Sequence, residues 1–414
     1  MSAVNYKWTK YACYYSCLSS SAVFVLPPML FAGFNKMYNV SYTLLGTLVL
    51  VNFFTQLIVD LIFTFFSKHF NIKITIKLMP LLASIGLIIY ALVPFLFKGF
   101  EYLGLLVGTI IFSAAGGLGE VLLSPTVAAI PSDTPEKDMS TLHSLYGYGV
   151  STVVIISSIF IKLFGVEKWM YLVLVFSILP LISFLFFWLV PLPNMDLSSQ
   201  KVQTINKHKN KNKILVLCTV CIFLGGAAEI TMTNWISVFA QNALKIPKLI
   251  GDTAGMLSFA ILLALSRTFY AKYGKNILNA LNYGMIGAAV CYIIVAFSTN
   301  SVVSLIACAM IGISTSMLWP GTLILMEEKL PGIGVAAYAL MASGGDLGAS
   351  IAPQLVGIVV DAVSQNPVLH YPLINLSMTP EQIGMKAGMF CASVFPILGV
   401  VLTFYMKKFF SKNT

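Results

Sequence analysis

Five acidic side chains lie inside long apolar stretches of this sequence: Asp60, Glu120, Glu229, Asp346 and Asp361. If these stretches span a bilayer, a charge at mid-membrane costs about 2.5 kcal/mol or more, so each acid is a candidate functional residue. Burial away from water favours the neutral form of a carboxyl group, which lets such an acid take up and release a proton. The five acids are therefore candidates for solute binding and proton transfer.

Glu120 has the best placed polar neighbours. Ser124 follows one turn later on the same face of a helix, and Pro125 removes one backbone hydrogen bond and so frees a carbonyl group nearby. A carboxyl, a hydroxyl and a free carbonyl would form a polar patch suited to a hydroxylated ligand or a transferable proton. We expect Glu120 to bind solute and carry a proton, with Ser124 as a further solute contact.

Glu229 lies at similar depth in its stretch and is followed by Asn234 and Trp235. On a straight helix Trp235 lies about 120 degrees from Glu229, so both face one cavity only if that face is wide or the helix is broken. We expect Glu229 to contact solute and to share in proton coupling, and Asn234 to contact solute. Trp235 and Trp319 could offer stacking faces, although Trp235 could instead lie in an interfacial aromatic belt.

His143 and Asp346 each have two interpretations. His143, in LHSLYGYG, could relay a proton, but histidines at the cytoplasmic ends of helices are often only hydrated. Asp346, in SGGDLGAS, lies among glycines that allow close helix approach, so its carboxylate could contact solute or accept hydrogen bonds from a neighbouring helix. Both interpretations stay open for each residue.

Asp60, Arg267 and Asp361 are expected nearer the ends of their stretches. Asp60 could act in gating, form a structural ion pair or face water, and Asp361 is expected to be solvated. Arg267, the only arginine, needs a carboxylate or carbonyl partner, so we expect a gating or structural pair. Because no other Lys or Arg lies well inside an apolar stretch, anionic solutes are disfavoured. Neutral hydroxylated solutes and cations remain.

Patterns typical of soluble enzymes and metal sites are missing from the sequence. It has no GxxxxGK[ST] phosphate loop, GxSxG elbow or HExxH helix. The pairs Cys13/Cys17 and Cys218/Cys221 lie in apolar runs without nearby histidines or acids, as expected of reduced thiols. We expect no catalytic residues, no metal and no cofactor, and any uphill transport would depend on an ion gradient.

The chain that must position these residues is strongly apolar. Of its 414 residues 58% are hydrophobic and 10% are charged, against about 25% charged residues in a soluble domain. Twelve apolar stretches approach the roughly 20 residues that cross a hydrocarbon core. They cover residues 8–34, 42–66, 75–97, 103–131, 141–164, 168–191, 214–243, 251–271, 277–298, 302–326, 333–362 and 383–406. We therefore predict an all-α membrane protein with twelve transmembrane helices, the first of them retained rather than cleaved as a signal peptide.

The longest polar segment, residues 192–213, divides the stretches into six and six. We expect it to be a cytoplasmic linker between an N-terminal six-helix bundle, residues 1–191, and a C-terminal one, residues 214–414. Two sequence echoes support related bundles: Gly117 with Pro125 corresponds to Gly312 with Pro320, and GGLGE resembles GGAAE in the seventh stretch. Such internal repeats are common in secondary transporters.

Lysines indicate the topology. With both termini cytoplasmic, 17 lysines fall on the inner side and 7 on the outer side, which fits the positive-inside rule. The lysines form short clusters between apolar runs, so the net charge of +10 does not indicate nucleic-acid binding. The excess of Lys over Arg suggests an AT-rich bacterial genome. We expect a multi-pass protein of a bacterial cell membrane, with a lipid bilayer and no nucleic acid as partner.

Four motifs resemble the major facilitator superfamily, and within it the branch of fucose permease and related sugar/proton symporters. GLGEVLLSP is similar to the branch's fourth-helix motif, LHSLYGYG to its fifth, AAEITMTNW to its seventh and MLWPGTLILMEEKLPG to its tenth. The sequence departs from the branch at Ser124, where Asn is usual, and in the first stretch, which has no acid. The resemblance implies two six-helix bundles, alternating access and Glu120 as the coupling acid.

The leading hypothesis is a secondary active transporter, working as a monomer, that moves a small neutral polar solute such as a sugar together with a proton. The alternative is an efflux carrier for lipophilic or cationic compounds, favoured by 18 Met, 29 Phe and acids without basic partners. A third class is a nontransporting receptor with the same fold, which would be expected to carry an added soluble domain.

Overall fold

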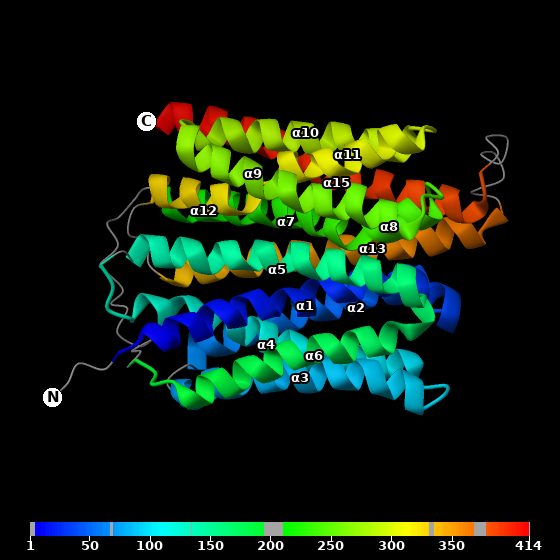
Figure 1. The fold of residues 1–414 in the computed structure, drawn as a ribbon. Coiled ribbons are helices and arrows are strands. Elements are labelled where there is room, and N and C mark those ends of the chain that lie inside the picture. The colour runs from blue at the N-terminus through cyan, green and yellow to red at the C-terminus, as the bar shows by residue number, and fades with distance from the viewer. Residues whose placement is uncertain are drawn as a thin grey trace. The chain divides into compact units, whose positions relative to one another are not determined.

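The computed structural model describes residues 5–66, 69–133, 135–193, 210–330, 335–367 and 378–413. In this part of the chain all regular structure is helical (Figure 1). The main helices are α1 Lys7–Tyr38, α2 Tyr42–Phe66, α3 Ile72–Leu96, α4 Glu101–Ala128, α5 Pro135–Phe164, α6 Trp169–Leu189, α7 Lys211–Asn242, α8 Lys248–Ile250, α9 Ser258–Tyr273, α10 Ile277–Phe297, α11 Ser301–Thr315, α12 Leu318–Lys329, α13 Val335–Gln365 and α15 Pro380–Asn413. A 3-10 turn, Val166–Lys168, precedes α6, and a π-helical segment, Gly251–Leu257, joins α8 to α9.

Twelve spans long and apolar enough to cross a membrane are present in the described residues, which confirms the predicted number. Lipid offers backbone groups no hydrogen bonds, so apolar spans must satisfy them within helices. Three of the spans are each built from more than one helical segment: Val166–Leu189 contains the 3-10 turn and α6, Lys248–Tyr270 contains the π-helical segment, and Ser301–Lys329 combines α11 and α12. Asparagines cap three helices at their N-termini, because Asn71, Asn276 and Asn300 accept hydrogen bonds from first-turn amides of α3, α10 and α11.

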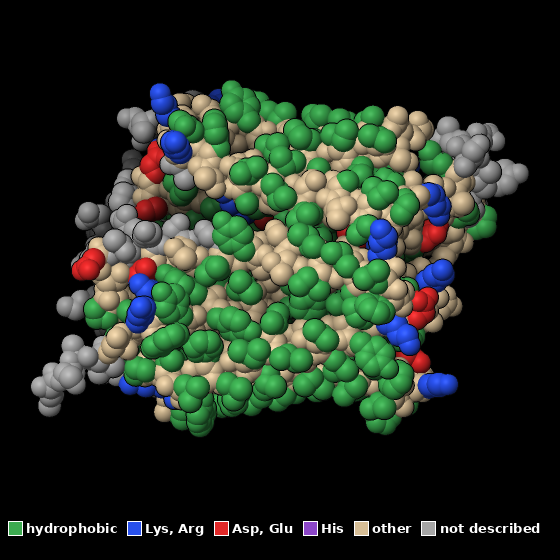
Figure 2. All heavy atoms as spheres, in the orientation of Figure 1, with side chains coloured by type: hydrophobic (Ala, Val, Ile, Leu, Met, Phe, Trp, Pro, Cys, Tyr) green, Lys and Arg blue, Asp and Glu red, His purple; other side chains and the backbone are tan. Residues whose placement is uncertain are grey.

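The helical surface matches a lipid environment. Exposed large apolar side chains occur along most spans, for example Phe65, Leu163, Leu189, Phe269 and Val401. Figure 2 shows hydrophobic side chains covering the middle of the visible face, with Lys, Arg, Asp and Glu gathered towards the two ends of the helices. This pattern is the one expected of transmembrane helices with hydrated ends.

Contacts divide the chain into two compact units. The first unit consists of the described parts of Met1–Leu30 and Phe54–Lys201, and the second of Phe31–Phe53 and Val202–Thr414. Most of the predicted linker, residues 194–209, lies outside the described residues, so the expected division into two bundles at that linker stays a prediction.

In the first unit α3 packs against α4 and α6. A Cβ atom on Gly108 would lie 2.6 Å from Cβ of Tyr90, so glycine permits the close approach of α3 and α4. The buried Tyr90 ring makes edge contacts with Phe112 and Trp169. Aromatic packing of this kind fixes the helices that carry Glu120.

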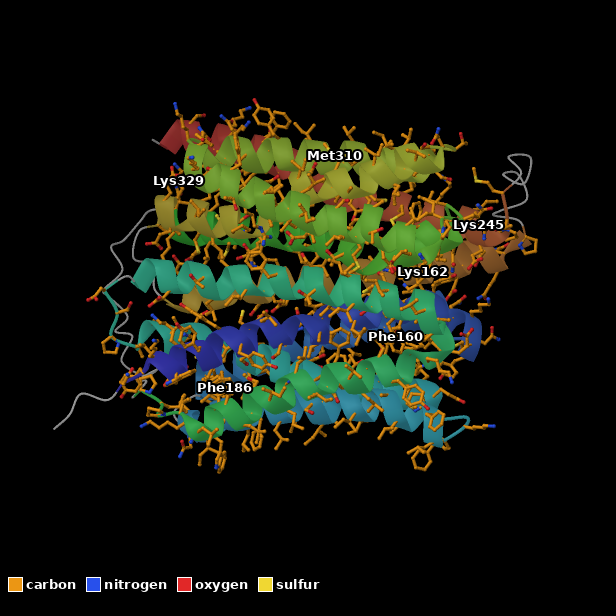
Figure 3. All side chains as sticks on the ribbon, viewed as in Figure 1. Phe160, Lys162, Phe186, Lys245, Met310 and Lys329 are labelled. Carbon is orange, nitrogen blue, oxygen red and sulfur yellow. The ribbon has the colours of Figure 1, made fainter. Side chains whose placement is uncertain are left out.

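In the second unit α7 packs against α13, and α15 packs against α13 and α10. The α7–α13 contact is nearly backbone to backbone, because a Cβ atom on Gly348 would lie 2.1 Å from the carbonyl oxygen of Phe223. Lys245, just after α7, and Lys329, at the end of α12, lie at opposite ends of this unit (Figure 3). The lysine count assigns these two residues to opposite sides of the membrane; which side is cytoplasmic stays a prediction.

A polar network joins α1 to the start of α5 in the first unit. Lys10 Nζ lies 2.9 Å from Asp138 Oδ2, Ser132 Oγ donates to the same oxygen at 2.7 Å, and the Tyr14 hydroxyl contacts Asp138 Oδ1 at 3.2 Å. The hydrogen bond from Ser132 and the bonds and charge of Lys10 lower the pKa of Asp138. Ionised Asp138 therefore stabilises the folded state.

This shift predicts a pH dependence of stability. The unfolded pKa of an Asp is about 3.9, so the stabilisation is fully present above that pH and is lost as the pH falls through the lower folded pKa. We expect Asp138→Asn to lower the melting temperature at pH 5 to 7, and the difference from wild type to shrink below about pH 4. Thermal unfolding of the detergent-solubilised protein measures it. Asp133→Asn, at an exposed aspartate, is the control; equal effects of both variants would contradict the assignment.

Candidate functional site

Glu120 lies eight residues before the end of α4, which continues without a break through Pro125. Its side chain is exposed. Ser124, one turn further, is partly buried.

Glycines before Glu120 bring two helices close to α4. A Cβ atom on Gly117 would lie 3.1 Å from Cβ of Val59 and 3.2 Å from Cα of Gln56, both on α2. A Cβ atom on Gly116 would lie 2.8 Å from the Phe24 ring of α1. The two glycines therefore allow α1 and α2 to approach α4 closely, and the Glu120 carboxylate lies about one turn after them.

Asp60, next to Val59 on α2, is half-buried and interacts electrostatically with Glu120. Its Oδ1 atom is buried and has no hydrogen-bond partner among the described residues. Neither Asp60 nor Glu120 forms an ion pair within that part of the chain. The structure thus brings together two of the predicted site residues, and here they lack a counter-charge.

Aromatic and uncharged side chains lie near this acid pair among the described residues. The rings of Phe24 and Tyr146 meet edge to face, with centroids 6.2 Å apart, and Cys17 lies within electrostatic range of Glu120. The backbone of His143 belongs to α5, but its side chain lies outside the described residues. Its predicted part in proton transfer therefore stays a prediction.

The second unit holds the other predicted acid in a different setting. Arg267 Nη2 lies 3.0 and 3.3 Å from the two carboxylate oxygens of Glu229, joining α9 to α7. Arg267 Nε also donates to the backbone oxygen of Ser316 at 2.8 Å. Both kinds of partner expected for Arg267 are therefore present, and Glu229 is charge-paired.

Pro320 explains why the Ser316 carbonyl is available. A helical carbonyl accepts from the amide four residues later, but Pro320 has no N–H. The span is broken at this position, since α11 ends at Thr315 and α12 begins at Leu318. The Arg267 guanidinium supplies the missing donor. One side chain therefore donates to the free carbonyl at the helix break and pairs with the Glu229 carboxylate.

Trp319 packs beside this break. Its ring lies against Gly226 of α7 and Gly345 of α13, where added Cβ atoms would come within 3.0 and 2.3 Å of ring carbons. Gly226 precedes Glu229 by three residues, and Gly345 adjoins Asp346, which is almost fully buried. Three predicted residues of this unit, Glu229, Trp319 and Asp346, therefore lie around one junction of α7, α12 and α13.

Trp235 and Asn234 are placed differently from a solute contact. The Trp235 side chain is fully buried, and its indole nitrogen donates to the Pro353 carbonyl at 3.1 Å. Asn234 is also buried, and its side-chain nitrogen donates to Ile230 in its own helix at 2.9 Å. In this conformation neither side chain offers a free surface, and their roles in solute binding stay predictions.

Asp361 is not simply solvated, and that expectation is wrong. Its Oδ1 atom accepts from the Tyr42 amide at 3.1 Å and its Oδ2 atom from the Thr43 amide at 2.6 Å. These amides belong to the first turn of α2 and lack partners within their own helix. The carboxylate therefore caps a helix distant in sequence.

Sequence analysis missed two buried acids, Asp138 and Asp252, and Asp252 lies in the π-helical segment. Its side chain is fully buried, accepts from Ser237 Oγ at 2.5 Å and pairs with Lys248 Nζ at 2.9 Å. The spacing of four between Lys248 and Asp252 is the signal that could have found the pair. The predicted span began at residue 251 and left the lysine outside. In the described residues no group of three or more metal-binding side chains is found.

Comparison with known proteins gives a consistent family. The model of the Major Facilitator Superfamily, whose members carry small molecules across membranes, matches residues 12–353. The search of curated protein sequences gives no match.

Solved structures of transporters share the fold. A bacterial homolog of the human lysosomal transporter Spinster, in an inward-facing and occupied conformation, has a TM-score of 0.74 and 10% identity, covering 97% of this chain and 96% of that one. For a D-xylose-proton symporter the values are 0.72 and 16%, with 96% and 98% covered. For the nucleoside transporter NupG they are 0.67 and 17%, with 97% and 98% covered. The family match and the twelve spans together show that this multi-pass membrane protein belongs to the Major Facilitator Superfamily.

Proposed function

We propose that this chain is a secondary active transporter that moves a small neutral polar solute, a sugar or a related hydroxylated compound, together with a proton. One observation carries the proposal: Glu120 is exposed and has no cationic partner in the described residues, whereas Glu229 is paired with Arg267. The two acids found by the same sequence argument therefore have different parts to play.

The cost of leaving a charge unpaired favours Glu120 over Glu229 as the carrier of the transported proton. Protonating Glu229 would leave the Arg267 guanidinium without its counter-charge, which is costly away from water. Protonating Glu120 removes an uncompensated charge. A carrier acid must be neutral in one stage of the cycle and charged in another, and Glu120 meets that condition at lower cost. His143 and Glu229 are secondary candidates.

The Glu229–Arg267 pair suits a neutral solute. The pair has no net charge, and Arg267 uses Nε and Nη2 for Ser316 and Glu229, so Nη1 keeps its donors. The Arg267 side chain is 40% exposed and that of Glu229 13%. A hydroxyl group, which donates and accepts, can bond to both partners. The xylose and nucleoside transporters among the structural neighbours carry solutes of this kind.

Uptake into proteoliposomes tests the proposal. Radiolabelled L-fucose, D-xylose and uridine are offered with and without an inward proton gradient, and with a protonophore. We expect accumulation of at least one solute that requires the gradient. Uptake at the same level with and without the gradient would contradict proton coupling. Absence of uptake for all of the hydroxylated solutes offered would contradict the proposed solute class.

A second function, efflux of organic cations, is favoured by the acid pair itself. Asp60 and Glu120 have no cationic partner in the described residues, and the Phe24 and Tyr146 rings lie on the neighbouring helices. Carboxylates beside aromatic rings attract organic cations. Transport of tetraphenylphosphonium, with no response to sugars, would favour this function over the first.

A further inference from the structure

The turn between α1 and α2 belongs to the second unit. The hairpin tip, Phe31–Phe53, contains the end of α1, the turn and the first half of α2, and its contacts group it with residues 202–414 rather than with the rest of its own helices. The hairpin tip therefore belongs to the second unit, although α1 and α2 continue into the first, which makes it a candidate moving part.

Backbones meet directly where the hairpin tip lies on α13. A Cβ atom on Gly357 would lie 2.2 Å from the Tyr42 carbonyl oxygen, and one on Gly46 would lie 3.0 Å from Cα of Gln354. Each helix therefore contributes a glycine to the seam. Close backbone approach of this kind makes the docked position specific.

Asp361 caps the start of α2 across this seam. The first turn of a helix carries amides without intrahelical partners and the positive end of the helix dipole. Ser41 Oγ accepts a hydrogen bond from the Leu44 amide at 3.3 Å, and the amides of Tyr42 and Thr43 donate to the Asp361 carboxylate. The capping carboxylate comes from α13, so the bonds exist only while the hairpin tip is docked.

The Tyr42 side chain makes a second set of bonds. Its hydroxyl donates to Glu381 Oε1 of α15 and accepts from Asn242 Nδ2 of α7 at 2.6 Å, and Asn242 also donates to Glu381 at 3.0 Å. Neither Asp361 nor Glu381 has an ion-pair partner in the described residues. Two carboxylates are thus held by neutral donors alone, and water can replace such donors at helix ends at small net cost.

The hairpin tip also covers Trp235. The Tyr42 and Phe31 rings lie 6.0 and 6.3 Å from the Trp235 ring, and the indole is completely buried beneath them. Polar bonds at the edge and an enclosed aromatic beneath them describe a closure that can open.

We propose that Asp361, Glu381 and Asn242 form a latch that holds the hairpin tip in place, and that Trp235 becomes accessible when the latch opens. In the transport cycle, opening would expose the solute path at this end of the molecule and closing would seal it. This role in the cycle rests on the proposed transport function. The latch equilibrium does not depend on it.

Hydrogen exchange of the full chain in lipid nanodiscs tests the latch. Asp361→Ala and Tyr42→Phe should each make exchange in peptides covering the start of α2 about tenfold faster, because each removes bonds that form only on docking. Tyr292→Phe is the matched control: it removes a buried hydrogen bond to Ala228, 2.7 Å long, in the same unit but outside the hairpin tip. It should leave the start of α2 at the wild-type rate.

A second readout follows Trp235 itself. The contribution of Trp235 to the fluorescence is the part that is lost in Trp235→Phe. In the Asp361→Ala variant, acrylamide should quench this contribution more strongly than it does in the wild type. Unchanged exchange at the start of α2 in Asp361→Ala would overturn the proposal, and so would equal acceleration in α10, which would indicate general loosening. Neither measurement uses a solute or a proton gradient, so a failure of the transport proposal is distinguishable from a failure of the latch.

Discussion

Replacing Glu120 by glutamine is expected to abolish proton-driven accumulation of the solute. With one proton moved per solute, a pH difference of two units supports about 100-fold accumulation, since each tenfold ratio corresponds to about 1.4 kcal/mol. Glutamine keeps the size and hydrogen-bonding atoms of the side chain but cannot release a proton. Accumulation in Glu120→Gln should therefore fall to about onefold, measured in proteoliposomes with an imposed pH gradient.

Exchange of labelled for unlabelled solute separates coupling from binding. Exchange needs no net proton movement, so Glu120→Gln should retain it if the solute site is intact. Glu101→Gln, the same substitution in the first turn of α4, is the matched control and should accumulate solute as wild type does. Accumulation by Glu120→Gln at the wild-type level would show that another group carries the proton.

The spans and the main acids could be predicted from the sequence, because the bilayer imposes simple rules. Apolar stretches must be helical, and charges within them are rare enough to mark sites. Glu120, Glu229 and Arg267 followed from those rules. That Arg267 pairs with Glu229 could not be predicted, since the two are 38 residues apart on different helices. The free carbonyl at Ser316 could have been found by applying to Pro320 the reasoning used for Pro125.

The surroundings of Asp361 and Trp235 could not be predicted from the sequence. An acid near a span end and a tryptophan beside a polar residue have ordinary interpretations as hydrated or stacking groups. Asp361 instead accepts hydrogen bonds from the start of α2, between residues 318 and 319 apart in the chain, and Trp235 is fully buried against the rings of Phe31 and Tyr42. Such contacts depend on how distant helices pack, which neither composition nor periodicity encodes. Asp252 was missed because its lysine partner lay just outside the predicted span.

Removal of Arg267 is expected to destabilise the protein. Arg267→Gln would leave Glu229 nearly buried and without a counter-charge, and would remove the donor to the Ser316 carbonyl at the helix break. Breaking a buried ion pair costs about 3 to 5 kcal/mol. Because the Arg267 side chain is 40% exposed, we expect a loss of at most about 3 kcal/mol, seen as a lower unfolding midpoint.

A double-mutant cycle separates the charge pair from the helix break. Glu229→Gln together with Arg267→Gln removes both charges, so the double variant should be more stable than Arg267→Gln alone. The Ser316 carbonyl loses its guanidinium donor in both variants, so any stability that the double variant fails to recover measures the contribution of that bond. If Arg267→Gln and the double variant unfold at the same midpoint, the Glu229 charge is not what Arg267 stabilises. The arginine would then act mainly by donating to the carbonyl that Pro320 leaves free, and the case for Glu229 as carrier of the proton that we assign to Glu120 would become stronger.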